Sequence, residues 1–157
     1  MIEITESPIN PESITSQVTR DTNGGVVTFL GTTRLYTEGR VVLHLEYEVY
    51  QPMAEKKIRE IAGEVKERWG IEDMAVAHRV GRLEIGEISL VVAVASPHRI
   101  EAFEACHYAV DRIKEIAPIW KKEVFEDGEV WVGCGEHREI SATPDPISAE
   151  LSRRQTT

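Results

Sequence analysis

The segment Ile88–Ala95 is an almost unbroken run of apolar and β-branched residues, and it limits the fold more than any other part of the chain. A strand of this composition has no polar face to turn to solvent, so both of its faces must be covered. Two long segments with helical periodicity flank it, Pro52–Trp69 before it and another after Ser96-Pro97. The chain therefore predicts a buried strand in a sheet on which helices pack.

The part of the chain before the first long helix contains several β-strand patterns. Val41–Tyr50 alternates apolar and polar residues, which predicts a half-buried strand. It is expected to form an antiparallel pair with the preceding β-rich stretch Gly25–Thr33, across the polar connection Leu35–Arg40. The first residues predict a strand at Ile2–Thr5 and a helix capped by Asn10, with Pro11 in its first turn, that runs to about Arg20.

The remaining elements follow the first long helix, which Gly70 is placed to end. A strand is expected at Met74–Val80, followed by a connection over Gly81–Gly86. Ser96 as N-cap and Pro97 at the first helical position are expected to start the second long helix, and Pro118 to end it. Two further strands, Ile119–Phe125 and Val130–Gly133, are expected to form a closing hairpin around Asp127-Gly128.

This order of elements predicts an α+β domain with helices packed on a largely antiparallel sheet. One domain is expected over residues 1–137, and the polar residues 138–157 are expected to form a tail. A net charge of -9 argues against a nucleic-acid partner. The absence of a membrane-spanning run and of a signal-peptide pattern predicts a cytoplasmic protein that does not enter a membrane. The two cysteines, Cys106 and Cys134, indicate neither a disulfide framework nor a metal site.

Three of the chain's six lysines, Lys114, Lys121 and Lys122, fall within nine residues of an otherwise acidic protein. Such a local cluster suggests a small anionic ligand. Pro118 divides the run, so Lys114 is expected near a helix end and the other two on the next element. Neighbouring side chains of a strand point to opposite faces, so at most one of Lys121 and Lys122 is expected to share a pocket with Lys114. Lys114 borders the apolar stripe of its helix, where either a solvated head group or a partly desolvated ammonium fits the pattern.

The start of the second long helix carries two cationic residues, His98 and Arg99, where the helix dipole disfavours positive charge. One explanation is an anion site, in which backbone N–H groups and both side chains bind a phosphate or carboxylate. The other is two solvated side chains on a well-capped helix, and the local pattern does not decide between them. Arg34 at a strand end carries little information alone, and His78 is expected to be a structural residue of the sheet.

Several stretches together resemble the catalytic (large) subunit family of molybdopterin synthase, in that family's order. Each motif alone is weak, but the ordered set, over roughly residues 24–133, is specific. The stretches are Phe29-Leu-Gly-Thr-Thr-Arg34, Leu45-Glu-Tyr-Glu-Val-Tyr50 with Met53-Ala54, His78-Arg79-Val-Gly81 with Ile85-Gly-Glu87, Ser96-Pro-His-Arg99 with Ala102-Phe103, and Lys114 through Pro118-Ile-Trp-Lys-Lys-Glu123 with Gly128 and Trp131.

The resemblance implies an α/β hammerhead fold with an added antiparallel β subdomain, and a homodimer within a heterotetramer. It implies that each large subunit binds a small ubiquitin-like sulfur carrier, whose Gly-Gly tail ends in a thiocarboxylate. It also implies transfer of two sulfurs to cyclic pyranopterin monophosphate, which opens the cyclic phosphate and forms the dithiolene of molybdopterin in molybdenum cofactor biosynthesis. Neither a metal nor a cofactor is implied for this step.

The same resemblance assigns roles to the cationic residues. Lys114 and Lys121 are expected to be catalytic, binding the carrier tail and stabilising charge or transferring a proton. Both ligands are anions, so cations fixed in a partly dry pocket fit the chemistry. The remaining positions are expected to contact the substrate and its phosphate: Arg34, His98 and Arg99, with Phe29 lining the same pocket and Lys122 as a neighbour with a weaker claim.

The sequence departs from the family pattern in one place, and it leaves other functions open. The family can supply an arginine after the final strand that reaches the partner subunit's site, but this chain has Gly133-Cys-Gly135, and its nearest arginine is Arg138.

A non-catalytic adaptor that docks a ubiquitin-like partner would not need His98 and Arg99 to face Lys114. An unrelated phosphometabolite-binding domain would lack a channel for the carrier tail.

Overall fold

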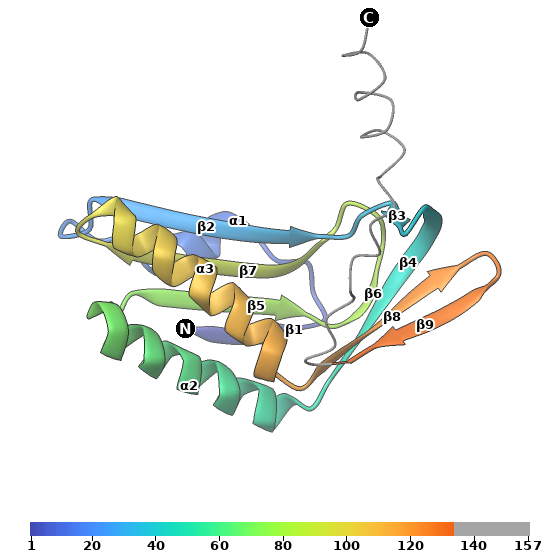
Figure 1. The fold of residues 1–157 in the computed structure, drawn as a ribbon. Helices are drawn as coiled ribbons and strands as arrows, with labels where there is room; N and C mark the ends of the chain where they lie inside the picture. The colour runs from blue at the N-terminus through green and yellow to red at the C-terminus, as the bar shows by residue number, and fades with distance from the viewer. Residues whose placement is uncertain (134–157) are drawn as a thin grey trace, which may run out of the picture.

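The computed structural model describes residues 1–133, which form an α+β fold with two sheets (Figure 1). This confirms the predicted fold class. No helix in the described part of the chain is long and apolar enough to cross a membrane. In chain order the elements are β1 (Ile2–Thr5), α1 (Pro11–Ser16), β2 (Gly25–Thr32), β3 (Tyr36–Thr37), β4 (Arg40–Val49), α2 (Gln51–Trp69), β5 (Met74–Arg79), β6 (Gly81–Leu83), β7 (Ile88–Ser96), α3 (Arg99–Ile116), β8 (Ile119–Phe125) and β9 (Gly128–Val132).

The first sheet has the strand order β1-β5-β7-β2, with β1 parallel to β5 and the other pairs antiparallel. The long helices α2 and α3 lie on one face and α1 on the other (Figure 1). Every residue of β7 after Ile88 is buried, as the apolar run predicts. Its residues alternate between two cores, with Leu90, Val92 and Val94 towards α2 and α3, and Val91, Ala93 and Ala95 towards α1.

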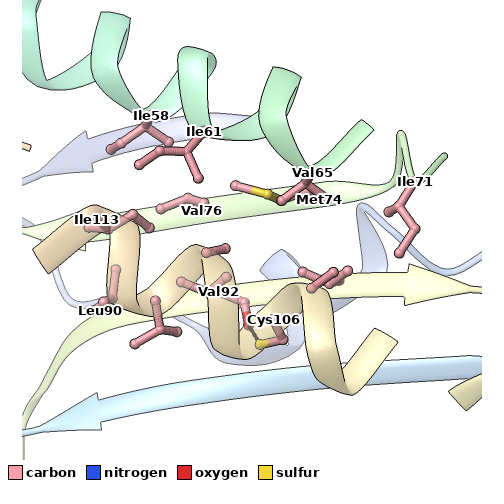
Figure 2. Packing of buried hydrophobic residues seen from close by; sticks show 14 of the residues in the cluster. Ile58, Ile61, Val65, Ile71, Met74, Val76, Leu90, Val92, Cys106 and Ile113 are labelled. Carbon is pink, nitrogen blue, oxygen red and sulfur yellow. Dashed lines mark hydrogen bonds between the residues drawn. The ribbon is translucent and has the colours of Figure 1, made fainter. Parts of the chain in front are cut away.

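The core between the sheet and the two long helices is made mainly of aliphatic side chains (Figure 2). Ile58, Ile61 and Val65 recur along α2 at helical spacing and are fully buried against β5 and α3. Gly70 ends α2 in the left-handed conformation, φ 67°, as its position predicts. Cys106 lies in the same core, and burial raises the pKa of its thiol to about 11, so it behaves as a small apolar residue.

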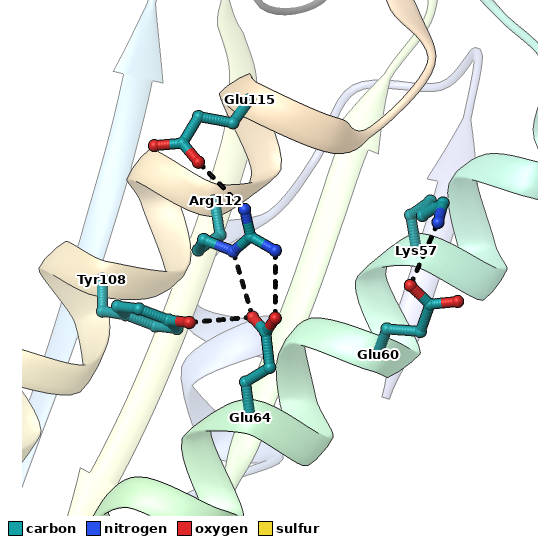
Figure 3. Close-up of polar contacts among 6 residues, drawn as sticks. All are labelled: Lys57, Glu60, Glu64, Tyr108, Arg112 and Glu115. Atoms are coloured by element: carbon teal, nitrogen blue, oxygen red, sulfur yellow. Dashed lines mark hydrogen bonds and ion pairs between the residues drawn. The ribbon is translucent and has the colours of Figure 1, made fainter.

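A polar cluster joins the outer surfaces of α2 and α3 (Figure 3). The Glu64 carboxylate accepts hydrogen bonds from Arg112 Nε at 3.1 Å and Arg112 Nη2 at 3.0 Å. It also accepts one from the Tyr108 hydroxyl at 2.9 Å, and Arg112 Nη1 donates to Glu115 at 2.9 Å. Two-point pairing of a guanidinium with a carboxylate fixes the relative position of the helices better than a single contact.

The second sheet has the order β3-β4-β8-β9, and β6 pairs with β4 as well. All of its pairs are antiparallel, and β8 and β9 form the predicted closing hairpin. This sheet lies at the end of the first one, where α3 ends and β8 begins (Figure 1). The hairpin and the last turn of α3 are therefore neighbours.

Three predictions about the N-terminal half are wrong. Gly25–Thr33 and Val41–Tyr50 do not pair: β2 pairs with β7, and β4 pairs with β8. The connection contains its own strand, β3, which folds back on β4 through Glu38 and Gly39, both at positive φ. The first helix ends at Ser16 rather than near Arg20. The N–H groups of the next two residues each donate to the carbonyl oxygen three residues earlier in the chain.

Two predicted boundaries after the first long helix also differ. The expected connection Gly81–Gly86 contains the short strand β6, because β4 offers it a partner. The N-cap of α3 is His98 rather than Ser96, and Arg99 is its first helical residue. Ser96 remains the last residue of β7, and its hydroxyl accepts a hydrogen bond from the His98 N–H at 3.4 Å.

Candidate active site

A cavity of about 540 Å³ lies where the two sheets meet, at the C-terminal end of α3. Its wall combines residues of β2, β4, β5, β7, α3 and β8 with the end of β9. Four of the residues singled out from the sequence line it: Phe29, Arg34, Lys114 and Lys121. The fold thus gathers in one place side chains that are up to 92 positions apart, from 29 to 121.

The break at Pro118 positions the two lysines of the cavity. Lys114 lies in the last turn of α3, where a cation is favoured by the helix dipole. The helix ends at Ala117, whose backbone is extended (φ -72°, ψ 127°), and β8 starts at Ile119. Lys121 then faces the cavity from β8, opposite Tyr47 of β4. The prediction that a helix and the following strand each contribute one lysine is confirmed.

The charge state of Lys121 depends on the groups that surround it. Its ammonium lies 3.3 Å from the carboxylate of Glu123, which is two residues further along β8 and only 2% exposed. Burial lowers the pKa of Lys121, the charge and hydrogen bond of Glu123 raise it, and the charges of Arg34 and Lys114 lower it further. The net pKa is below the ordinary value for lysine. Lys121 therefore releases its proton more easily than a surface lysine.

Lys122 points to the opposite face of β8, as alternation predicts. Its ammonium pairs with Glu46 and, at 3.5 Å, with Glu129, and it lies 5.5 Å from the centre of the Trp131 ring. The hydrogen bond that Lys122 donates to Glu46 is the main reason that the pKa of Lys122 is raised. Lys122 does not line the cavity, so the structure does not support its expected place beside the substrate.

His98 and Arg99 are not brought to the cavity of their own chain. They lie at the N-terminal end of α3, whereas Lys114 lies at its other end (Figure 1). Arg99 and Lys114 are fifteen positions apart in the helix, which corresponds to about 22 Å along the helix axis. Both side chains are exposed. Within one chain, His98 and Arg99 therefore do not reach the cavity that Lys114 lines.

The cavity also contains residues that the sequence did not single out as functional. Tyr47 and Glu123 face it beside Lys121, and His78 and Ser89 line it from the first sheet. Strand alternation gave a usable signal for Glu123, because residues two apart share a face. Tyr47 and Ser89 come from separate strands, so only the fold reveals their proximity. Cys134 and Arg138 lie outside the described residues, as does the predicted tail.

Comparisons with known proteins identify the family. The family model described as MoaE protein matches residues 4–116. The chain belongs to the MoaE protein family. It is 48% identical over 143 residues to the molybdopterin synthase catalytic subunit of Bacillus subtilis, which covers 91% of this chain and 90% of that protein. This confirms the resemblance found in the motifs.

Solved structures agree with this assignment. The crystal structure of molybdopterin synthase from Staphylococcus aureus matches with a TM-score of 0.80 and 46% identity, over 83% of this chain and 96% of that chain. A complex of subunits 1 and 2 of molybdopterin-converting factor from Helicobacter pylori matches with a TM-score of 0.70, over 83% of this chain and 89% of that chain. Its identity is 18%, so that likeness concerns the fold alone.

Proposed function

We propose that this protein is the catalytic subunit of a molybdopterin synthase, a sulfurtransferase of molybdenum cofactor biosynthesis. It transfers sulfur from the C-terminal thiocarboxylate of a small ubiquitin-like carrier to cyclic pyranopterin monophosphate. The observation that carries the proposal is the cavity in which Arg34, Lys114 and Lys121 meet. Close relatives that bear the name of this catalytic subunit support it.

The cavity residues suit a reaction between two anions. A thiocarboxylate and a cyclic phosphate repel each other, and three cations around one space offset that repulsion. As the sulfur–carbon bond forms at the pterin, a phosphate oxygen leaves with negative charge and needs a proton or a cation. Lys121, with its lowered pKa, is suited to give up a proton there. Lys114, which lines the same cavity, is suited to hold the carrier's terminal carboxyl group.

The partner in this proposal is a small carrier subunit with a Gly-Gly tail. The Helicobacter pylori protein of the same fold was solved as a complex of two subunits, which supports a small partner for this chain. A Gly-Gly tail has no side chains, so it is slim enough to enter the cavity that Lys114 lines. No nucleic acid, membrane or metal takes part. A cytoplasmic location, a domain over residues 1–137 and a tail over 138–157 belong to the same proposal.

A homodimer would give His98 and Arg99 a place in the reaction. In the described part of the chain β2 is an edge strand, paired with β7 on one side only. Large apolar side chains lie exposed beside this edge: Val26 and Leu30 on β2, and Ile100 and Phe103 on α3, the latter two 60% and 61% exposed. A long apolar edge strand is prone to pair with another chain. We infer that two copies associate along β2.

Antiparallel pairing of two β2 edges would complete the cavity. Gly25 at the start of β2 lies against Arg99: a Cβ placed on Gly25 would be 2.9 Å from Arg99 Cα. Residues Phe29–Thr32 at the other end of the strand line the cavity. Two antiparallel copies therefore bring the Arg99 end of one beside the cavity of the other. This arrangement supplies the substrate-binding role expected of His98 and Arg99 from the second copy.

Mixing two inactive variants tests the shared site. Arg99→Ala and Lys114→Ala are each expected to lose nearly all activity. A refolded equimolar mixture should regain about a quarter of the wild-type rate, because about half of the dimers are mixed and each of those has one intact site of two. A mixture that stays as inactive as its components would reject the shared site. It would leave the sulfurtransferase assignment to be judged on the product.

Reconstitution tests the function itself. The purified chain, a thiocarboxylated carrier and cyclic pyranopterin monophosphate are combined, and the pterin is followed by mass spectrometry. The proposal predicts a product with two added sulfurs, and the absence of any sulfurated pterin where a reference enzyme forms it would refute the proposal. The adaptor alternative is distinguished by binding: an adaptor does not bind the pterin phosphate in the absence of the carrier, whereas the enzyme does.

A further inference from the structure

The cavity wall contains a buried imidazole, that of His78 on β5. Met74, Val76 and His78 alternate along the face of β5 that packs against α2 and α3, so the imidazole continues an apolar row. The residue is only 5% exposed, yet it lines the cavity. Burying a polar ring in such a row costs free energy unless its nitrogens find partners. Where those partners lie therefore indicates what the ring does.

One nitrogen of the ring already has a partner within the protein. Nδ1 lies 2.8 Å from the carbonyl oxygen of Arg79. A carbonyl oxygen can only accept, so Nδ1 carries the hydrogen and Nε2 presents a lone pair. Tyr47 packs edge-on against the ring, with 5.0 Å between ring centres and 71° between planes. Burial also lowers the pKa of His78 to about 4, so the ring is neutral at neutral pH. Its tautomer and its plane are both fixed.

The other nitrogen, Nε2, has no hydrogen-bond partner among residues 1–133. Two side-chain polar atoms in that part of the chain are fully buried and lack a partner, Thr33 Oγ1 and Glu101 Oε2. Nε2 is not one of them, so it is not sealed inside apolar packing. Nearby polar groups are engaged elsewhere: Lys121 with Glu123, and the Ser89 hydroxyl with the carbonyl of Gly31 at 3.2 Å. Nε2 is thus a fixed acceptor that the cavity offers to a ligand.

We propose that His78 is a specificity-determining residue, whose Nε2 accepts a hydrogen bond from an amide-type N–H group of the bound ligand. This rests on the proposed function, since both reactants carry such donors: the ring amide of the pterin and the peptide N–H groups of the Gly-Gly tail. Arg34, Lys114 and Lys121, when protonated, bind the anionic ends of these ligands but cannot accept a hydrogen bond. An N–H buried without an acceptor weakens binding by about tenfold to a hundredfold.

Two substitutions separate the roles of the two nitrogens. His78→Asn places an amide nitrogen where Nδ1 lies, so it can still donate to the Arg79 carbonyl, but it has nothing at the position of Nε2. His78→Gln reaches the position of Nε2 and can present its amide oxygen as an acceptor. His107→Asn is the matched control, because its side chain is 81% exposed on α3. Thermal unfolding of each variant shows whether it is folded.

The measurement is calorimetric titration of cyclic pyranopterin monophosphate, and separately of the carrier, onto each variant, with KM and kcat determined alongside. The His78→Asn variant is expected to bind one of the two ligands at least about tenfold more weakly, with a matching rise in KM and little change in kcat. The ligand affected identifies the donor. His78→Gln should recover most of the affinity, and His107→Asn should match the wild type.

Several outcomes would overturn the proposal. One is a folded His78→Asn variant that binds both ligands as tightly as the wild type. Another is a His78→Gln variant that binds the affected ligand no more tightly than a folded His78→Asn variant. If His78→Asn does not fold, His78→Gln decides alone: near wild-type affinity supports the acceptor role, and weakened binding of both ligands refutes it. If the wild type turns over normally and the His78 variants bind both ligands as it does, only this inference is rejected. If the wild type forms no sulfurated pterin, the proposed function is rejected.

Discussion

The ion pair between Lys121 and Glu123 gives a quantitative test of how the cavity is held together. The two side chains lie 3.3 Å apart, and the lysine is 31% exposed while the glutamate is 2% exposed. Removing one partner of a fully buried pair destabilises a protein by about 3–5 kcal/mol, because a buried charge loses its counter-ion. The lysine is partly solvated and Glu123 makes a further interaction, so the loss is smaller, and Lys121→Met should lower the free energy of unfolding by about 2–3 kcal/mol.

A second substitution should restore that stability without restoring activity. In Lys121→Met/Glu123→Gln no buried carboxylate remains, so most of the lost free energy should return. Urea unfolding of the wild type, both single variants and the double variant gives the coupling free energy, and product formation is assayed on the same samples. A double variant no more stable than Lys121→Met would refute the reasoning, as would one with wild-type activity.

Two further predictions concern the supports of the site. Glu64→Gln should cost about 1 kcal/mol at neutral pH. The hydrogen bond that Glu64 accepts from Arg112 holds the pKa of Glu64 below its ordinary value. The ionised carboxylate therefore adds its full stability at pH values above the ordinary pKa, and this stability is lost as the pH falls through the pKa of the folded protein. Thermal unfolding of variant and wild type should therefore converge in acid, and a constant difference would contradict this. Gly25→Ala puts a Cβ 2.9 Å from Arg99 Cα, so the backbone must shift, at about 1–3 kcal/mol. It should weaken pterin phosphate binding more than Gly63→Ala, at a glycine with open space around it.

The parts of the fold that could be predicted are those specified by local patterns. The apolar run Ile88–Ala95 predicted a strand buried on both faces, and Pro118 predicted the break between α3 and β8. The pairing of strands was harder to predict from the sequence, because several strands compete for the same partners. Gly25–Thr33 and Val41–Tyr50 are adjacent in sequence, but β7 and β8 are the strands that pair with them.

The candidate site divides in the same way. Lys114 and Lys121 could be predicted to converge because a single proline separates their elements. The opposite orientation of Lys122 followed from strand alternation alone. The place of His98 and Arg99 could not be predicted, since it depends on the length and direction of α3 and, in our proposal, on a second copy of the chain. His78 and Tyr47 meet only because the two sheets come together.

The rate of a single sulfur transfer in three matched lysine variants tests the central claim most directly. Lys114→Met, Lys121→Met and Lys122→Met are each mixed with thiocarboxylated carrier and cyclic pyranopterin monophosphate, and the sulfurated pterin is measured over time. Loss of a preorganised cation predicts a rate reduced on the order of a hundredfold for the first two, and a nearly unchanged rate for Lys122→Met. Near-normal rates for both cavity variants, or an equal loss in all three, would contradict the account.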